Sequence, residues 1–99
     1  MQSFEMPATT PSDFVARVRA ELAKRGYDRN LAVRLEGDRL TVAFRWMGTT
    51  SFDYQVVETT DGFRADLVSQ RISPFHAAFT DRFERYFKQA LTELGATIA

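Results

Sequence analysis

Apolar and polar residues alternate along four segments in the middle of this 99-residue chain. The segments are residues 31–36, 39–47, 51–58 and 63–72. Alternation with a period of two is typical of strands that bury one face and expose the other. Short turn-forming sequences separate the four segments. The pattern therefore predicts a four-stranded antiparallel meander whose apolar positions all face the same way.

The turn sequences predict how these strands are paired. Residues 37–38 suit a two-residue hairpin turn, because a glycine occupies its first position. A three-residue turn at 48–50 would place Arg45 opposite Asp53 on the polar face. A four-residue turn at 59–62 keeps the apolar side chains of the last strand on the same face as the others. Each turn thus preserves a single buried face.

Two helical patterns flank the meander. Thr10 can cap a helix that starts with Pro11, and apolar residues at helical spacing predict this helix over 12–25. Ser73, followed by a proline, predicts the start of a second helix with a broad apolar arc that ends near Gly95. We therefore expect an α+β fold, a two-layer α-β-β-β-β-α arrangement with both helices on one face of the sheet.

The chain has the length of one domain. Residues 1–9 show no clear period and are predicted to form a flexible N-terminal tail, although Phe4 and Met6 offer apolar side chains that could dock on the domain. Residues 10–99 are predicted to form a single α+β domain.

Composition narrows the function classes. Thirteen basic and thirteen acidic residues give zero formal net charge, so the charge of the whole chain favours neither nucleic acid nor an anionic membrane as a partner. Cysteine is absent, which excludes disulfides and thiolate metal sites. No stretch approaches the ~20 apolar residues of a membrane-spanning helix, and no signal peptide is evident, so a cytoplasmic location is expected. Eleven arginines against two lysines suggest a GC-rich bacterial source.

His76 is the single histidine of the chain. A metal site would need further ligands, and no nucleophile and carboxylate can be paired with this imidazole from the sequence. We therefore expect a structural role for His76, no catalytic residue, no cofactor and no metal. An enzyme is not expected.

The polar face of the predicted sheet is one candidate site. Arginine is favoured in protein interfaces, because its planar guanidinium group forms paired hydrogen bonds. The leading hypothesis is a non-enzymatic protein-interaction domain, or a homodimer, that uses this face or an edge strand. The predicted docking residues are Arg34, Arg45, Met47, Asp53, Val57, Arg64, Asp66 and Val68.

The aromatic interior supports an alternative hypothesis. Ligand pockets are commonly lined by apolar and aromatic side chains with a few polar groups. A cavity between the sheet and the helices would make the protein a small-ligand-binding domain. The predicted lining residues are Trp46, Tyr54, His76, Phe79 and Phe83.

Overall fold

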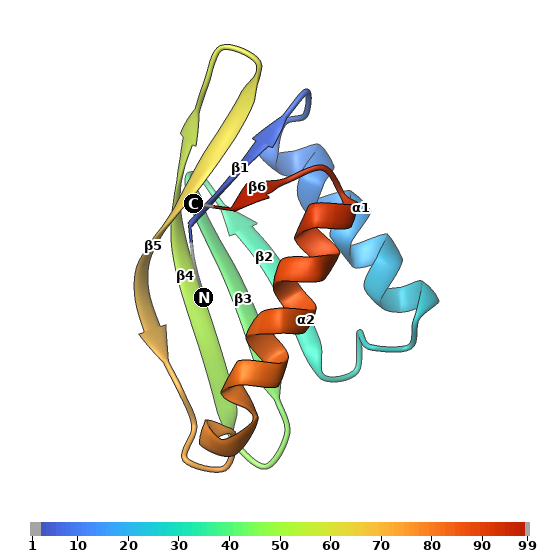
Figure 1. Ribbon diagram of the computed structural model, residues 1–99, viewed down its shortest axis with the longest axis vertical. Helices are drawn as coiled ribbons and strands as arrows, with labels where there is room; N and C mark the ends of the chain where they lie inside the picture. The colour runs from blue at the N-terminus through green and yellow to red at the C-terminus, as the bar shows by residue number, and fades with distance from the viewer. Residues whose placement is uncertain (1–2, 99) are drawn as a thin grey trace.

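The computed structural model describes residues 3–98, which form two α-helices and one six-stranded antiparallel sheet (Figure 1). The predicted α+β class is confirmed. The elements in chain order are β1 (Phe4–Pro7), α1 (Pro11–Lys24), β2 (Leu31–Glu36), β3 (Arg39–Arg45), β4 (Thr49–Glu58), β5 (Gly62–Arg71), the short 3-10 helix η1 (Ala77–Phe79), α2 (Thr80–Glu93) and β6 (Thr97–Ile98).

The sheet has the strand order β2-β3-β4-β5-β1-β6, and both α-helices lie over the same face (Figure 1). The four consecutive strands β2 to β5 are the predicted meander. The prediction of four strands is incomplete, because β1 and β6 extend the sheet beyond β5. The chain thus brings its two terminal strands together at one edge of the sheet.

Strand β1 differs from the predicted flexible tail. Phe4 and Met6 are 0% and 1% exposed, and they pair with Ala65 and Phe63 of β5. The strand comes very close to β5, since a Cβ at Gly62 would collide with the carbonyl group of Met6. Two apolar side chains enter the core, but four residues repeat the alternation too few times to be recognised. Residues 1–2 of the predicted tail lie outside the described residues.

Helix α1 follows its sequence signals closely. The Thr10 side chain accepts a hydrogen bond from the Asp13 amide at 3.2 Å, and Pro11 occupies the first helical position. Gly26 takes a positive φ of 75° just after the helix, which a residue without a side chain adopts readily. The observed helix begins and ends one residue earlier than predicted.

Helix α2 begins later than predicted. Ser73 does not cap it; the Ser73 hydroxyl instead accepts a hydrogen bond from the Phe75 amide at 3.3 Å in a separate turn. The Ser73 amide donates to the Thr50 hydroxyl of β4 at 3.0 Å, so this segment is bonded to the sheet. The α-helix starts only at Thr80, after η1.

The strand register was predicted correctly for two of the three central hairpins. Strands β2 and β3 pair as expected. Residues 63–67 of β5 also pair with β4 as expected, up to a β-bulge that shifts the register of the residues that follow. The pairing of β3 with β4 differs: Arg45 lies opposite Thr49, and Asp53 lies opposite Thr41. The turn consists of residues 46–48, and Met47 adopts a positive φ of 53° within it. Moving the turn by two residues leaves the side chains of residues 39–45 and 51–58 on their expected faces, so alternation alone cannot detect the change, but Trp46 falls in the turn and becomes exposed.

Aromatic rings fill the centre of the core. Phe4, Phe14 and Phe63 pack with ring centroids 5.3–6.3 Å apart, and Tyr54 lies 5.4 Å from Phe4. These four side chains come from β1, α1, β4 and β5, and each is at most 2% exposed. The cluster therefore fixes the N-terminal half of α1 against strands β4, β5 and β1.

Candidate functional site: an apolar pocket between the helices

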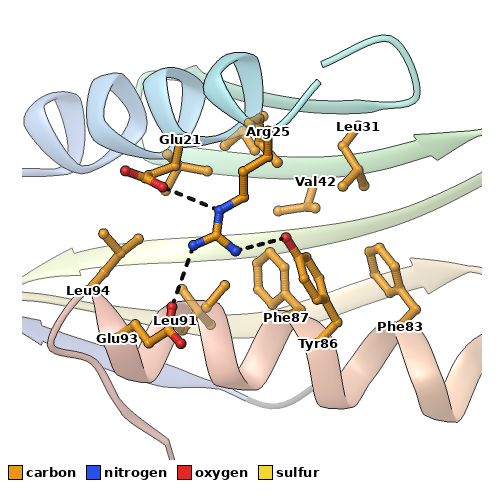
Figure 2. A pocket seen from close by; sticks show the side chains of 14 residues that line it. Glu21, Arg25, Leu31, Val42, Phe83, Tyr86, Phe87, Leu91, Glu93 and Leu94 are labelled. Atoms are coloured by element: carbon orange, nitrogen blue, oxygen red, sulfur yellow. Dashed lines mark hydrogen bonds and ion pairs between the residues drawn. The ribbon is translucent and has the colours of Figure 1, made fainter. Parts of the chain in front are cut away.

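A pocket of about 260 Å³ lies between α1 and α2, above strands β2 and β3 (Figure 2). Its floor is formed by side chains of the sheet, among them Val33 and Val42, which are 4% and 2% exposed. Leu22 of α1 and Leu91 of α2 form opposite walls. This volume is close to the lower end of the range typical of small-ligand pockets, roughly 300–1,000 Å³.

The size of the neighbouring side chains explains why this region is open. The first turn of α1 is held against the sheet by the large ring of Phe14. Farther along, the apolar side chains that α1 offers to the pocket are Val18 and Leu22, which are smaller than Phe14, while α2 contributes Ala90 beside the larger Phe83, Phe87 and Leu91. The sequence thus fills one end of the space between the helices and leaves the other end unfilled.

Arg25 lies across the mouth of the pocket (Figure 2). Its Nε is 3.4 Å from a Glu21 carboxylate oxygen, its Nη2 is 3.7 Å from Glu93, and its Nη1 donates to the Tyr86 hydroxyl at 3.5 Å. The hydrogen bond to Tyr86, together with the two carboxylates, raises the pKa of Arg25 above its ordinary value. The guanidinium group is therefore a permanent cation at this position.

The contacts of Arg25 leave room for another acceptor. Charge-assisted hydrogen bonds of good geometry are typically 2.7–2.9 Å long, whereas all three contacts of this guanidinium are 3.4 Å or longer. Arginine has five N–H donors. An oxygen atom of a ligand can thus bond to Arg25 at the pocket mouth by displacing the distant Glu93.

Polar groups of the mouth both donate and accept hydrogen bonds. Glu21 and Glu93 accept, Arg25 donates, and the Tyr86 hydroxyl can do either. Two carboxylates and one guanidinium give this cluster a formal charge of −1, so it does not attract anions by net charge. The arrangement suits a polar group that is recognised by directed hydrogen bonds, joined to an apolar body in the pocket.

The five predicted cavity residues are not gathered around this pocket. Phe83 alone among them lines it. Tyr54 is buried in the core, whereas Trp46 and Phe79 are 48% and 44% exposed at one end of the molecule. The space beside His76, Phe79 and Phe83 measures only about 20 Å³, which is room for about one water molecule.

Burial raises the pKa of Tyr54 above its ordinary value, and the nearby charge of Glu84 raises it further. The Tyr54 phenol therefore stays protonated over the whole neutral range. It contributes packing to the core and has no exposed surface for a ligand.

His76 is 3% exposed and is held at both ring nitrogens. Its Nε2 bonds to the carbonyl oxygen of Trp46, and its Nδ1 lies 2.6 Å from the Thr50 hydroxyl. Because a carbonyl only accepts, we assign the hydrogen to Nε2, so that Thr50 donates to Nδ1. Thr50 in turn accepts from the Ser73 amide at 3.0 Å. The imidazole thus links the β3–β4 turn and the segment between β5 and α2 to strand β4.

Polar groups on the outer face of the sheet bond mainly to one another. Asp53 accepts hydrogen bonds from Thr41 at 2.8 Å and from Ser69 at 3.0 Å. Arg64 lies 3.0 Å from Asp66 on its own strand. The expected pairing of Arg45 with Asp53 is wrong, for the register reason given above.

The other predicted docking residues are scattered. Arg34 lies 3.9 Å from Glu36, Val57 is 41% exposed on β4, and Val68 is the extra residue of the β-bulge in β5. Arg45 and Met47 lie at the β3–β4 turn. At edge strand β2, the Arg19 side chain donates to the Val33 carbonyl at 2.9 Å. Docking through this face or edge stays a prediction.

Sequence reasoning missed Arg25 and Tyr86 as site residues. The spacing of Glu21 and Arg25 signals an ion pair within a helix, and the broad apolar arc of α2 signals a second contact surface. Neither signal shows that the two helices separate. The position of the pocket depends on the packing of side chains that are distant in sequence.

Among residues 3–98, no group of three His, Cys, Asp or Glu side chains is placed to hold a metal ion. Over the same residues, neither helix combines the length and the apolar character needed to cross a bilayer. A scan against protein-family models, a search of curated proteins and a search of solved structures each gave no match to this chain.

Proposed function

We propose that this protein binds a small amphipathic molecule in the pocket between α1 and α2. The apolar body of the ligand lies on the floor of Val33 and Val42, and an oxygen-bearing end bonds to Arg25. The observation that carries this proposal is the pocket of about 260 Å³ with a buried apolar floor and a cation at its mouth.

Burial of apolar surface supplies the binding energy in this proposal. Each buried methylene group contributes about 0.8 kcal/mol, which corresponds to roughly a fourfold change in affinity. Affinity should therefore rise with alkyl chain length and level off once the pocket is full. The polar end contributes orientation, because the guanidinium group lies on one side of the opening.

The test is a titration with straight-chain fatty acids of increasing length and with the matching alcohols, followed by calorimetry. Ala90→Trp places a large side chain in the pocket and should abolish binding. Ala20→Trp is the matched control, since Ala20 is an exposed position of α1 outside the pocket lining. Arg25→Gln should weaken the acids more than the alcohols, because a charged acceptor loses more when the cation is removed.

Equal binding by wild type and Ala90→Trp would exclude this pocket as the site. Absence of saturable binding for every member of both series would contradict the proposal as a whole. Folding of both tryptophan variants is checked by thermal unfolding, so that a loss of binding is not confused with a loss of structure.

A further inference from the structure

Four large apolar side chains are exposed together at one end of the molecule. Trp46 and Met47 belong to the β3–β4 turn, and they are 48% and 63% exposed. Phe75 and Phe79 belong to the segment between β5 and α2, and they are 61% and 44% exposed. The two segments meet beyond the ends of β3 and β5, at the bottom of the view in Figure 1. The rings of Trp46 and Phe79 are 6.1 Å apart.

This aromatic end is held in place by its backbone hydrogen bonds. The Trp46 amide donates to the Gly48 carbonyl at 3.0 Å, and the Trp46 carbonyl accepts from His76. A Cβ at Gly48 would collide with the Ser73 hydroxyl, so the turn packs tightly on the second segment. Exposure of the four side chains is thus built into the fold.

These hydrogen bonds also make the end suited to an apolar environment. A backbone group that leaves water without a partner costs several kcal/mol. At this end the Arg45 carbonyl accepts from the Asn30 side chain at 2.9 Å, and the Trp46 carbonyl is bonded to the buried imidazole. The turn can therefore leave water without exposing these carbonyl groups unpaired.

The segments that carry the aromatic end, together with the first turn of α2, contain more basic than acidic residues. Residues 45–49 and 71–82 contain three arginines, Arg45, Arg71 and Arg82, and one acidic residue, Asp81, which sum to +2. Over residues 3–98, none of these three guanidinium groups takes part in an ion pair. The zero net charge of the whole chain predicts no attraction to an anionic membrane. It is a sum over all residues, however, and these segments carry a local charge of +2.

We infer that this end of the molecule docks on an anionic phospholipid surface. Trp46, Met47 and Phe75 enter the interfacial layer, and Arg45 and Arg71 bond to the lipid phosphates. Tryptophan is enriched at the level of the headgroups, where its amphipathic ring is stable. Basic residues close to an anionic leaflet each add about 1 kcal/mol of attraction.

The shape of this surface favours lipid over a protein partner. The four exposed side chains belong to the β3–β4 turn and to the segment between β5 and α2, and both segments lie at one end of the sheet (Figure 1). A protein partner would need a matching apolar concavity, whereas a lipid interface adapts to a projecting group. The unpaired arginines complement a dense array of phosphates. This inference does not depend on the pocket, which lies between the two helices and shares none of these side chains.

Trp46 provides a direct readout, since it is the only tryptophan in the chain. Vesicles of phosphatidylcholine alone are compared with vesicles that also contain phosphatidylglycerol. We expect the Trp46 emission to shift to shorter wavelength, and the protein to cosediment, only with the anionic vesicles. Lipids with brominated acyl chains should quench the shifted emission, and added salt should weaken binding.

Two sets of variants separate the apolar and the charged contributions. Met47→Ser combined with Phe75→Ser retains Trp46 as the reporter and should abolish vesicle binding. Its matched control is Val57→Ser combined with Val68→Ser, two exposed apolar residues on the outer face of the sheet. Arg45→Gln should weaken partitioning roughly fivefold, whereas Arg34→Gln on β2 should leave it unchanged.

Several results would overturn the inference. One is that wild type neither shifts its emission nor cosediments with anionic vesicles. Another is equal binding to both vesicle types, or unchanged binding after the double substitution at Met47 and Phe75. If wild type ignores vesicles but forms oligomers that this double substitution dissociates, the surface is a protein interface and the lipid assignment is wrong.

Discussion

The hydroxyl group of Thr50 connects the hydrogen bonds that hold the aromatic end against β4. It accepts from the Ser73 amide and donates to His76, and Thr50 is 4% exposed. Thr50→Val keeps the shape of the side chain but leaves two buried polar groups without partners. Since each such group costs about 1–3 kcal/mol, we expect the unfolding free energy to fall by roughly 2–6 kcal/mol. Denaturant unfolding measures this change.

Thr49→Val is the matched control for this substitution. Thr49 is the preceding residue on β4 and is exposed, so its replacement should alter stability by no more than about 0.5 kcal/mol. Equal effects of the two substitutions would contradict the assigned role of the Thr50 hydroxyl.

Tyr54 gives the folded protein a defined sensitivity to alkaline pH. Burial raises the pKa of Tyr54 in the folded state, whereas in the unfolded chain this phenol has a pKa of about 10. Below pH about 10 both states keep the proton, so this group has no effect on stability. Above it the unfolded state loses the proton first, and unfolding free energy falls by up to about 1.4 kcal/mol per pH unit.

Tyr54→Phe removes this contribution. The stability advantage of wild type over the variant should therefore shrink as pH rises above about 10, because all other titrating groups are shared by both proteins. Urea unfolding of both proteins at a series of alkaline pH values measures the difference. Parallel stability curves would show that Tyr54 is not protected from ionisation.

Among the elements, the short strand β1 buries two of its four side chains in the core. Phe4 is fully buried against Phe14, Tyr54 and Phe63. Phe4→Ala should lower unfolding free energy by about 3–5 kcal/mol, as is usual for truncation of a buried aromatic side chain. Phe75→Ala, at a position that is 61% exposed, should change it by about 0.5 kcal/mol or less. If Phe4→Ala is equally mild, β1 is not part of the core.

Elements with strong local signals were predictable from the sequence, and those fixed by distant contacts were not. The Thr10 cap and the glycine after α1 are local, and the turn at 37–38 sets the β2–β3 register by itself. The start of α2 depends instead on the hydrogen bonds that join Ser73 and His76 to Thr50 of β4. The β3–β4 register depends on the same loop, since alternation permits more than one turn position.

At the scale of the whole molecule, the protein is a twisted sheet with two helices that cover one face without closing on each other (Figure 1). Sequence patterns predicted an apolar interior and a possible cavity between the layers. They predicted a different lining, of which only Phe83 lines the pocket, because the position of the pocket depends on how α1 and α2 pack on the sheet. Because the two helices separate, part of the apolar interior opens as a pocket that can bind a ligand.

The most direct test of the central claim maps a ligand onto the structure by NMR. Methyl resonances of valine and leucine are recorded while a straight-chain alcohol is added, because the polar cluster at the pocket mouth does not attract anions by net charge. We predict saturable shifts for Val18, Val42 and Leu91, which line the pocket, and unchanged resonances for Val57 and Val68 on the opposite side of the sheet. Shifts confined to Val57 and Val68, or no saturable shift at the pocket methyl groups, would contradict binding between the helices.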